Sequence, residues 1–198
     1  LDKIKSIAKN EKKYSEFYKE YGRMIKEGVY QDYENKDSLL DLLRFSSTTT
    51  EGTVSLQDYI DRMKPEQKTI YYLIGDNQSS LKDSPLLEMY NKKDIEVLLL
   101  DDEVDEVIMP VIPKYKDFDL KAVNRSSAAD ELKDESVKVN EKEIKPLIKK
   151  IKKILGDRVK DVKISNRLSD SPSCLVADEN DPTSQMQEIM KAMGQAGM

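Results

Sequence analysis

The stretches KTIYYLIGD (residues 68–76) and IEVLLLDDEVDE (residues 95–106) decide the fold of this chain. Each begins with a run of β-branched, aromatic and leucine residues that has the length of a buried strand. The first run ends at a Gly-Asp turn, and the second leads directly into a predicted helix over residues 103–112. A short helix is predicted between them, over residues 86–94. Strands and helices in alternation predict a parallel sheet covered by helices.

Helical patterns precede and follow this core. Apolar side chains recur every three to four positions, which predicts helices over residues 9–26, 36–44, 56–63 and 143–155. We expect the first to close at Gly28 and the last at Gly156, as a C-terminal cap. The stretch FSSTTTEGT is predicted to be a polar loop, and DVKISNRL and PSCLVAD to be strands of a small antiparallel sheet.

The predicted class is therefore α/β (α+β) with two domains. Residues 1–124 should form a compact three-layer α/β/α unit. Residues 125–139 are polar and acidic and have no hydrophobic period, which indicates a linker or exposed segment. Residues 140–198 should form a small α+β domain, and Asp181-Pro182 should begin its last helix.

Composition excludes several classes of function. The chain has no histidine, which excludes Ser-His-Asp and Cys-His catalysis and histidine-ligated metal sites. The single cysteine, Cys174, fits a reducing cytoplasm and is expected to be a small buried hydrophobe. The sequence has no apolar run of the roughly twenty residues that span a bilayer. A net charge of -5 gives no reason to expect nucleic acid, and the lysines near residues 145–160 are interpreted as a solvated helix face.

Two polar clusters each allow a functional and a structural interpretation. The hydroxyl run FSSTTT could cradle phosphate, but it lacks glycines and a following lysine, so hydroxyls that cap neighbouring backbone groups are favoured. The acidic run DDEVDE could hold a metal ion or act as a general acid and base. Acidic residues at a helix start also favour the positive end of the helix dipole, and this interpretation is preferred. These residues predict no enzyme.

The C-terminal stretch SQMQEIMKAMGQAGM carries a different signal. Its apolar residues fall at positions i, i+3, i+4 and i+7 of a predicted helix: Met186, Ile189, Met190 and Met193. We call these four residues the Met stripe. The stripe could be ordinary core, but methionine is also over-used on adaptable binding surfaces. The abrupt end, together with Leu1 at the start, leads us to expect a piece of a longer chain.

Several motifs, in their order and spacing, closely resemble the heat shock protein 90 chaperone family. LLRFSSTTT, LQDYIDRMKPEQKTIYYLIGD and SPLLEMYNKKDIEVLLLDDEVDE are similar to its middle domain. ILGDRVKDVKIS, RLSDSPSCLVADEND and QMQEIMKAMGQ are similar to the C-terminal domain of its bacterial, high-temperature protein G type. The resemblance covers essentially the whole chain.

The resemblance implies a molecular chaperone that holds partly folded client proteins. Family members are ATP-driven, Mg-dependent homodimers, and their nucleotide domain and phosphate-reaching arginine would precede Leu1, so neither enzymatic activity nor a cofactor is expected in this stretch. The dimerisation helices would follow Met198. Clients are implied to contact Met186, Ile189, Met190 and Met193, and a second patch on the helix after the Asp-Glu start, at Val107, Ile108 and Pro110. Relatives often carry an aromatic residue where this chain has Val107, and a polar one where it has Pro110.

These implications leave a main and an alternative expectation. The main one is a bacterial, cytoplasmic client-binding module without nucleic-acid or membrane partners. The alternative is a structural module whose Met stripe is buried in an oligomer interface.

Overall fold

A six-stranded mixed sheet forms the centre of the computed structural model, which describes residues 1–132, 141–178 and 181–182. The strand order is β2-β1-β4-β3-β6-β5. The strands are β1 (Phe45–Ser47), β2 (Thr53–Val54), β3 (Thr69–Ile74), β4 (Val97–Leu100), β5 (Lys114–Tyr115) and β6 (Phe118–Ala122).

The middle of the sheet is parallel, as predicted. Strand β3 pairs in parallel with β4, with Tyr71 opposite Val97, and with β6, with Ile70 opposite Leu120. The edges are antiparallel: β1 pairs with β2 and β4, and β5 pairs with β6. The predicted loop over FSSTTTEGT is wrong for its first residues, because Phe45–Ser47 form β1 beside β4.

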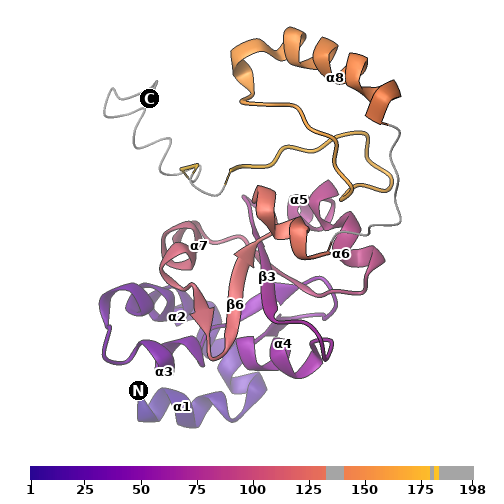
Figure 1. Cartoon of the computed structure of the whole chain (residues 1–198). Coiled ribbons are helices and arrows are strands. Elements are labelled where there is room, and N and C mark those ends of the chain that lie inside the picture. The colour runs from indigo at the N-terminus through magenta and orange to yellow at the C-terminus, as the bar shows by residue number, and fades with distance from the viewer. Residues whose placement is uncertain (133–140, 179–180, 183–198) are drawn as a thin grey trace, which may run out of the picture.

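Helices cover both faces of the sheet (Figure 1). The α-helices are α1 (Asp2–Ala8), α2 (Glu11–Gln31), α3 (Lys36–Leu40), α4 (Leu56–Arg62), α5 (Gln78–Lys82), α6 (Glu88–Lys92), α7 (Glu103–Ile108) and α8 (Glu141–Leu155). The 3-10 helices are η1 (Pro85–Leu87), η2 (Met109–Val111), η3 (Ser126–Leu132) and η4 (Gly156–Arg158).

The buried strands send alternate side chains to opposite faces, which produces two cores. Tyr72 and Leu98 join the core under α2, α3, α4 and α7, whereas Tyr71 and Leu99 join the core under α5, η1 and α6. On the second face the rings of Tyr71 and Tyr90 meet edge-on, with 4.9 Å between their centroids. The three-layer arrangement predicted from the sequence is confirmed.

The N-terminal helices differ from the prediction. A separate helix α1 was missed, and α2 continues past Gly28 to Gln31. Gly28 therefore does not end the helix. A Cβ at this position would lie 3.3 Å from Cδ1 of Leu39, so the glycine lets α3 approach α2 closely.

The C-terminal part was predicted less well. Helix α8 ends before Gly156, whose φ of +55° confirms the predicted cap. The predicted antiparallel strands over residues 161–168 and 172–178 are wrong: the described residues form one isolated parallel bridge there, between Arg125 and Ala177. Cys174 is half-buried and its neighbour Leu175 is 81% exposed, so PSCLVA is no buried apolar strand.

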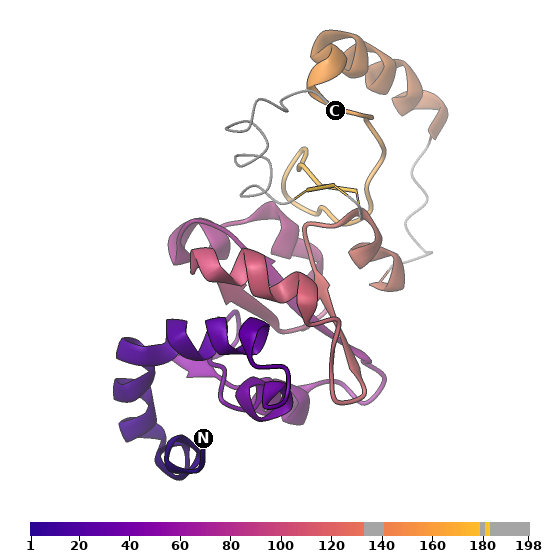
Figure 2. The same cartoon turned by 90° about the vertical axis from the view of Figure 1, so that its left-hand side faces the viewer.

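The predicted linker begins with ordered structure. Residues 126–132 form η3, and Ala128 within it is 1% exposed. The proposed boundaries at residues 124 and 139 stay predictions. Figures 1 and 2 both place α8 at the end of the molecule opposite to α1.

Candidate functional site

Helix α7 and the 3-10 helix η2 that follows it carry the one predicted client patch that lies within the described residues. Asp102 caps the helix, and its side chain accepts a hydrogen bond from the backbone N–H of Val104 at 3.2 Å. The carboxylate of Asp105 reaches back to the N–H of Asp102, which completes a capping box. The acidic run therefore caps the start of a helix, as its preferred interpretation predicted.

The structure separates the three residues predicted for this patch. Val107 is 46% exposed and Pro110 is exposed, so both can meet another molecule. Ile108 is 0% exposed and lies in the core, so it offers no surface to a client in this structure. Successive helical residues point about 100° apart, so two neighbours on a packed helix rarely both face solvent. We call Val107 and Pro110 the α7 patch.

A buried ion pair fixes α7 to α2. Nζ of Lys26 lies 2.8 Å from both carboxylate oxygens of Asp105 and 3.5 Å from Asp102. Asp105 is 0% exposed, and this burial raises its pKa to about 6 although Lys26 lowers it. Val107 follows Asp105 by two positions, roughly 200° around the helix, so the ion pair holds one side of α7 while the other faces solvent.

A second polar contact fixes η2, the 3-10 helix that follows α7. Nζ of Lys36, in α3, donates a hydrogen bond to the carbonyl oxygen of Val111 at 2.6 Å. The α7 patch therefore sits on a support that is held from both α2 and α3.

The Met stripe lies outside the described residues. Met186, Ile189, Met190 and Met193 stay a sequence-based prediction, as does the helix expected to begin at Asp181-Pro182.

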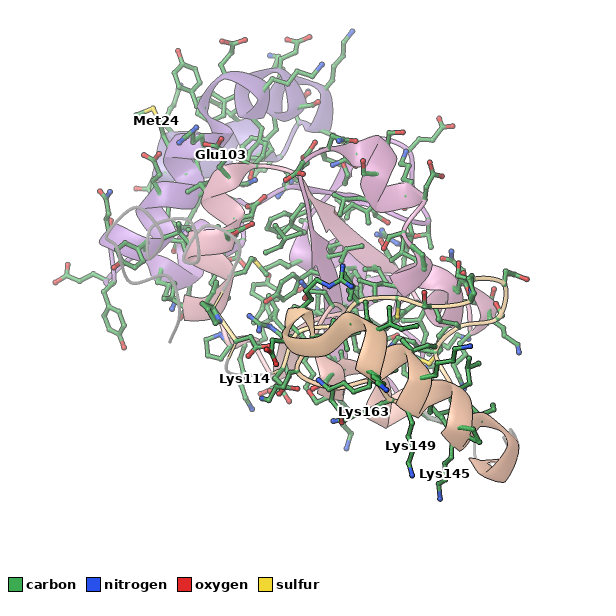
Figure 3. The ribbon with its side chains drawn as sticks, turned by 90° about the horizontal axis from the view of Figure 1, so that it is seen from above. Met24, Glu103, Lys114, Lys145, Lys149 and Lys163 are labelled. Carbon is green, nitrogen blue, oxygen red and sulfur yellow. The ribbon has the colours of Figure 1, made fainter. Side chains whose placement is uncertain are left out.

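Helix α8 exposes an apolar row that the sequence analysis did not single out as a site. Leu147, Ile151 and Ile154 occur at i, i+4 and i+7 and are 55%, 36% and 65% exposed. Lys145 and Lys149 extend outward from the same helix, as Figure 3 shows. The spacing was visible in the sequence. Which side would be exposed depends on packing, and a sequence pattern does not give that.

The hydroxyl run at β1 serves the sheet. Oγ of Ser47 donates to Oε1 of Glu96 at 2.6 Å, and Oγ1 of Thr48 accepts from the N–H of Val97 at 3.0 Å. Glu96 also receives two hydrogen bonds from Arg62, at 2.7 and 3.0 Å. The favoured interpretation, in which the hydroxyls serve neighbouring groups, agrees with these contacts.

Comparison with known proteins gives the family. The family model described as Hsp90 protein matches residues 1–197, so this chain belongs to the Hsp90 family of chaperones. The resemblance stated from its motifs is thereby confirmed.

Similar curated relatives include bacterial proteins named Chaperone protein HtpG. The one from Treponema denticola is 48% identical over 204 residues, which covers 98% of this chain and 32% of the relative. Those from Wolinella succinogenes and Borreliella burgdorferi are each 48% identical, over 198 and 196 residues. They cover 99% and 98% of this chain, and again 32% of each relative. This chain thus spans about a third of the length of the curated relatives it matches.

In the part of the chain that the structure describes, none of the helices has the length and hydropathy to cross a bilayer.

Proposed function

We propose that this chain is a client-binding part of an Hsp90-type chaperone. It would hold partly folded proteins through the Met stripe and the α7 patch. The observation that carries the proposal is the exposure of Val107 on α7 and of Pro110 on η2, because Lys26 fixes α7 and Lys36 fixes η2 from behind. Membership of a chaperone family supports it.

The physical reasoning concerns weak, unselective contacts. Any apolar segment that covers a small exposed apolar surface removes that surface from water, which lowers the free energy of the complex. Such binding does not require a particular sequence. Methionine side chains adapt to many shapes, which suits the Met stripe to the same role.

The whole protein is proposed to be an ATP- and Mg-dependent homodimer in the bacterial cytoplasm. In this proposal the nucleotide is bound and hydrolysed outside the present stretch, and nucleic acid and membranes are not partners. The names of the HtpG relatives support the chaperone class; the ATP cycle and the dimer are extensions of it.

The alternative function is assembly, in which the Met stripe is buried between copies of the chain. It is favoured by the regular spacing of the stripe, which would suit a helix-helix interface as well as a client.

Client binding is tested with an unfolded model protein, such as a reduced and alkylated small globular protein. One variant carries serine at Met186, Ile189, Met190 and Met193, and another carries Val107→Ser with Pro110→Ser. The matched control is Tyr33→Ser, because Tyr33 is 86% exposed and lies outside both patches. Circular dichroism must show that all variants fold alike.

We expect the stripe variant to weaken client binding at least about ten-fold, because four apolar contacts are lost. The α7 variant should weaken it less, and the control should bind as the original chain does. Equal binding by all four proteins would refute the proposal. Light scattering addresses the alternative: a concentration-dependent dimer that serine substitution abolishes, together with unchanged client binding, would favour assembly.

A further inference from the structure

Glu88, the first residue of α6, holds a stretch of chain more than eighty positions away. Its carboxylate accepts hydrogen bonds from three consecutive backbone N–H groups: Ser169 at 2.6 Å, Asp170 at 2.9 Å and Ser171 at 3.0 Å. Hydrogen bonds to an ionised acceptor are the stronger kind. Bonds from Ser171, Asp170 and Ser169 accordingly hold the pKa of Glu88 at about 2.

Arg167 makes a second contact, in which a side chain of the segment donates hydrogen bonds to backbone carbonyl oxygens of the α/β part. Nη1 of its guanidinium donates to the carbonyl oxygen of Val123 at 2.8 Å, and Nη2 donates to those of Arg125 at 3.0 Å and Ser126 at 3.3 Å. The planar fork of arginine suits several acceptors at once. Val123 is itself tied to the sheet, because its N–H donates to the carbonyl oxygen of Tyr72 at 2.8 Å.

Backbone contacts lie beside these two side chains. The N–H of Ala177 donates to Asn124 and the carbonyl oxygen of Ala177 accepts from Ser126, both at 2.9 Å. Nη1 of Arg125 donates to the carbonyl oxygens of Asp178 at 2.6 Å and Asp181 at 2.8 Å. Figures 1 and 2 show the orange-to-yellow segment running along the end of the α/β part near α6.

These polar contacts take the place of an apolar core in this region. Residues 161–178 contain neither a helix nor a strand, and Arg167 is the one buried residue among them. Elements with few buried apolar contacts open at low free-energy cost. Because water competes for both partners, hydrogen bonds, including the stronger ones to Glu88, add only modest net stability to the closed segment.

We propose that Glu88 and Arg167 form a latch that reversibly holds residues 165–178 against the α/β part of the chain. The two side chains belong to opposite partners of this contact. Glu88 reaches from the α/β part to the segment, and Arg167 reaches from the segment back to the end of β6. When these contacts break, the segment is no longer held against the α/β part. The direction in which α8 and the residues beyond 178 leave the α/β part is then no longer fixed. This inference does not depend on client binding.

Residue-resolved amide hydrogen exchange of the whole 198-residue chain tests the latch. Glu88→Gln keeps the shape of the side chain and removes its charge. The matched control is Glu66→Gln, which removes the same charge from an exposed site before β3. We expect exchange at Ser169, Asp170 and Ser171 to quicken roughly ten-fold or more in Glu88→Gln. Exchange in β3 and β4 should stay unchanged, and the control should match the original chain.

A second variant acts from the other side of the latch. Arg167→Lys keeps the positive charge but places a single nitrogen where Nη1 bonds Val123 and Nη2 bonds Arg125 and Ser126, so the planar fork is lost. It should quicken exchange over residues 165–178 and increase the rate at which the half-buried thiol of Cys174 is alkylated.

The exchange rates distinguish a local latch from a contribution to the stability of the whole fold. Unchanged exchange at residues 169–171 in Glu88→Gln would overturn the proposal. If Glu88→Gln instead speeds exchange in β3 and β4 as well, Arg167→Lys decides. A local effect there supports a latch, and a global one shows that these contacts belong to the stability of the whole fold and overturns it.

Discussion

Asp105 is the residue whose ionisation should be visible in the stability of the protein. Burial raises its pKa to about 6 in the folded chain, above the ordinary value of 3.8. Between these values the folded state holds more protons than the unfolded state, so the stability contribution of this group falls as pH rises from about 4 to about 6. Below 4 both states are protonated, and above 6 the loss is complete.

We therefore expect the original chain to lose stability relative to Asp105→Asn over this range. A shift of about two pKa units corresponds to a change on the order of 2–3 kcal/mol. Urea unfolding of both proteins at several pH values between 4 and 7.5 measures the difference. The prediction is wrong if the unfolding free energy of the original chain, minus that of Asp105→Asn, stays constant or rises as pH increases from 4 to 6.

At the scale of elements, Glu96 ties helix α4 and strand β1 to strand β4. It is 9% exposed and accepts hydrogen bonds from Arg62 and Ser47. Glu96→Gln should lower the unfolding free energy by about 1–2 kcal/mol, because Arg62 is partly exposed and water replaces part of the lost interaction. Thermal unfolding, compared with Glu66→Gln as a charge-matched control, measures the effect. A melting temperature equal to that of the control would contradict the prediction.

The same elements show which parts of the fold the sequence could predict. Strands β3 and β4 are continuous apolar runs, which only a sheet buried on both faces accommodates. Strands β1, β2 and β5 have two or three residues each, so pairing with neighbours defines them rather than their own pattern. The alternation in residues 161–168 misled for the converse reason: alternation predicts a strand only where a neighbouring strand is available, and among the described residues none pairs there.

The candidate site was predictable to a similar degree. The motifs predicted a helix after the Asp-Glu start, which the structure has as α7, and Val107 and Pro110 are exposed; that clients contact them stays a prediction. Ile108 was misassigned because the phase of a six-residue helix against its core depends on tertiary packing. The Lys26–Asp105 pair that supports the helix joins residues 79 positions apart, and no local pattern encodes such a contact.

At the scale of the whole molecule, the two client patches proposed above would make affinity depend on client length. A client that reaches both the Met stripe and the α7 patch makes its second contact at a high effective concentration, whereas a short peptide covers only one patch. We expect a long unfolded client to bind on the order of a hundred-fold more tightly than a ten-residue apolar peptide. Serine substitution of either patch should remove most of this advantage while the other patch still binds the peptide.

The latch should affect only the long client. If Glu88 and Arg167 set the direction in which the chain leaves the α/β part, Glu88→Gln broadens the range of distances between the two patches and lowers their effective concentration. The short peptide does not sense that distance, so its affinity should be unchanged. Fluorescence titrations of both ligands against the original chain, Glu88→Gln and Glu66→Gln measure this directly. Equal loss for the long client and the peptide would mean that Glu88→Gln damages a patch itself. No loss for either would mean that the client does not bridge the two patches across the latch.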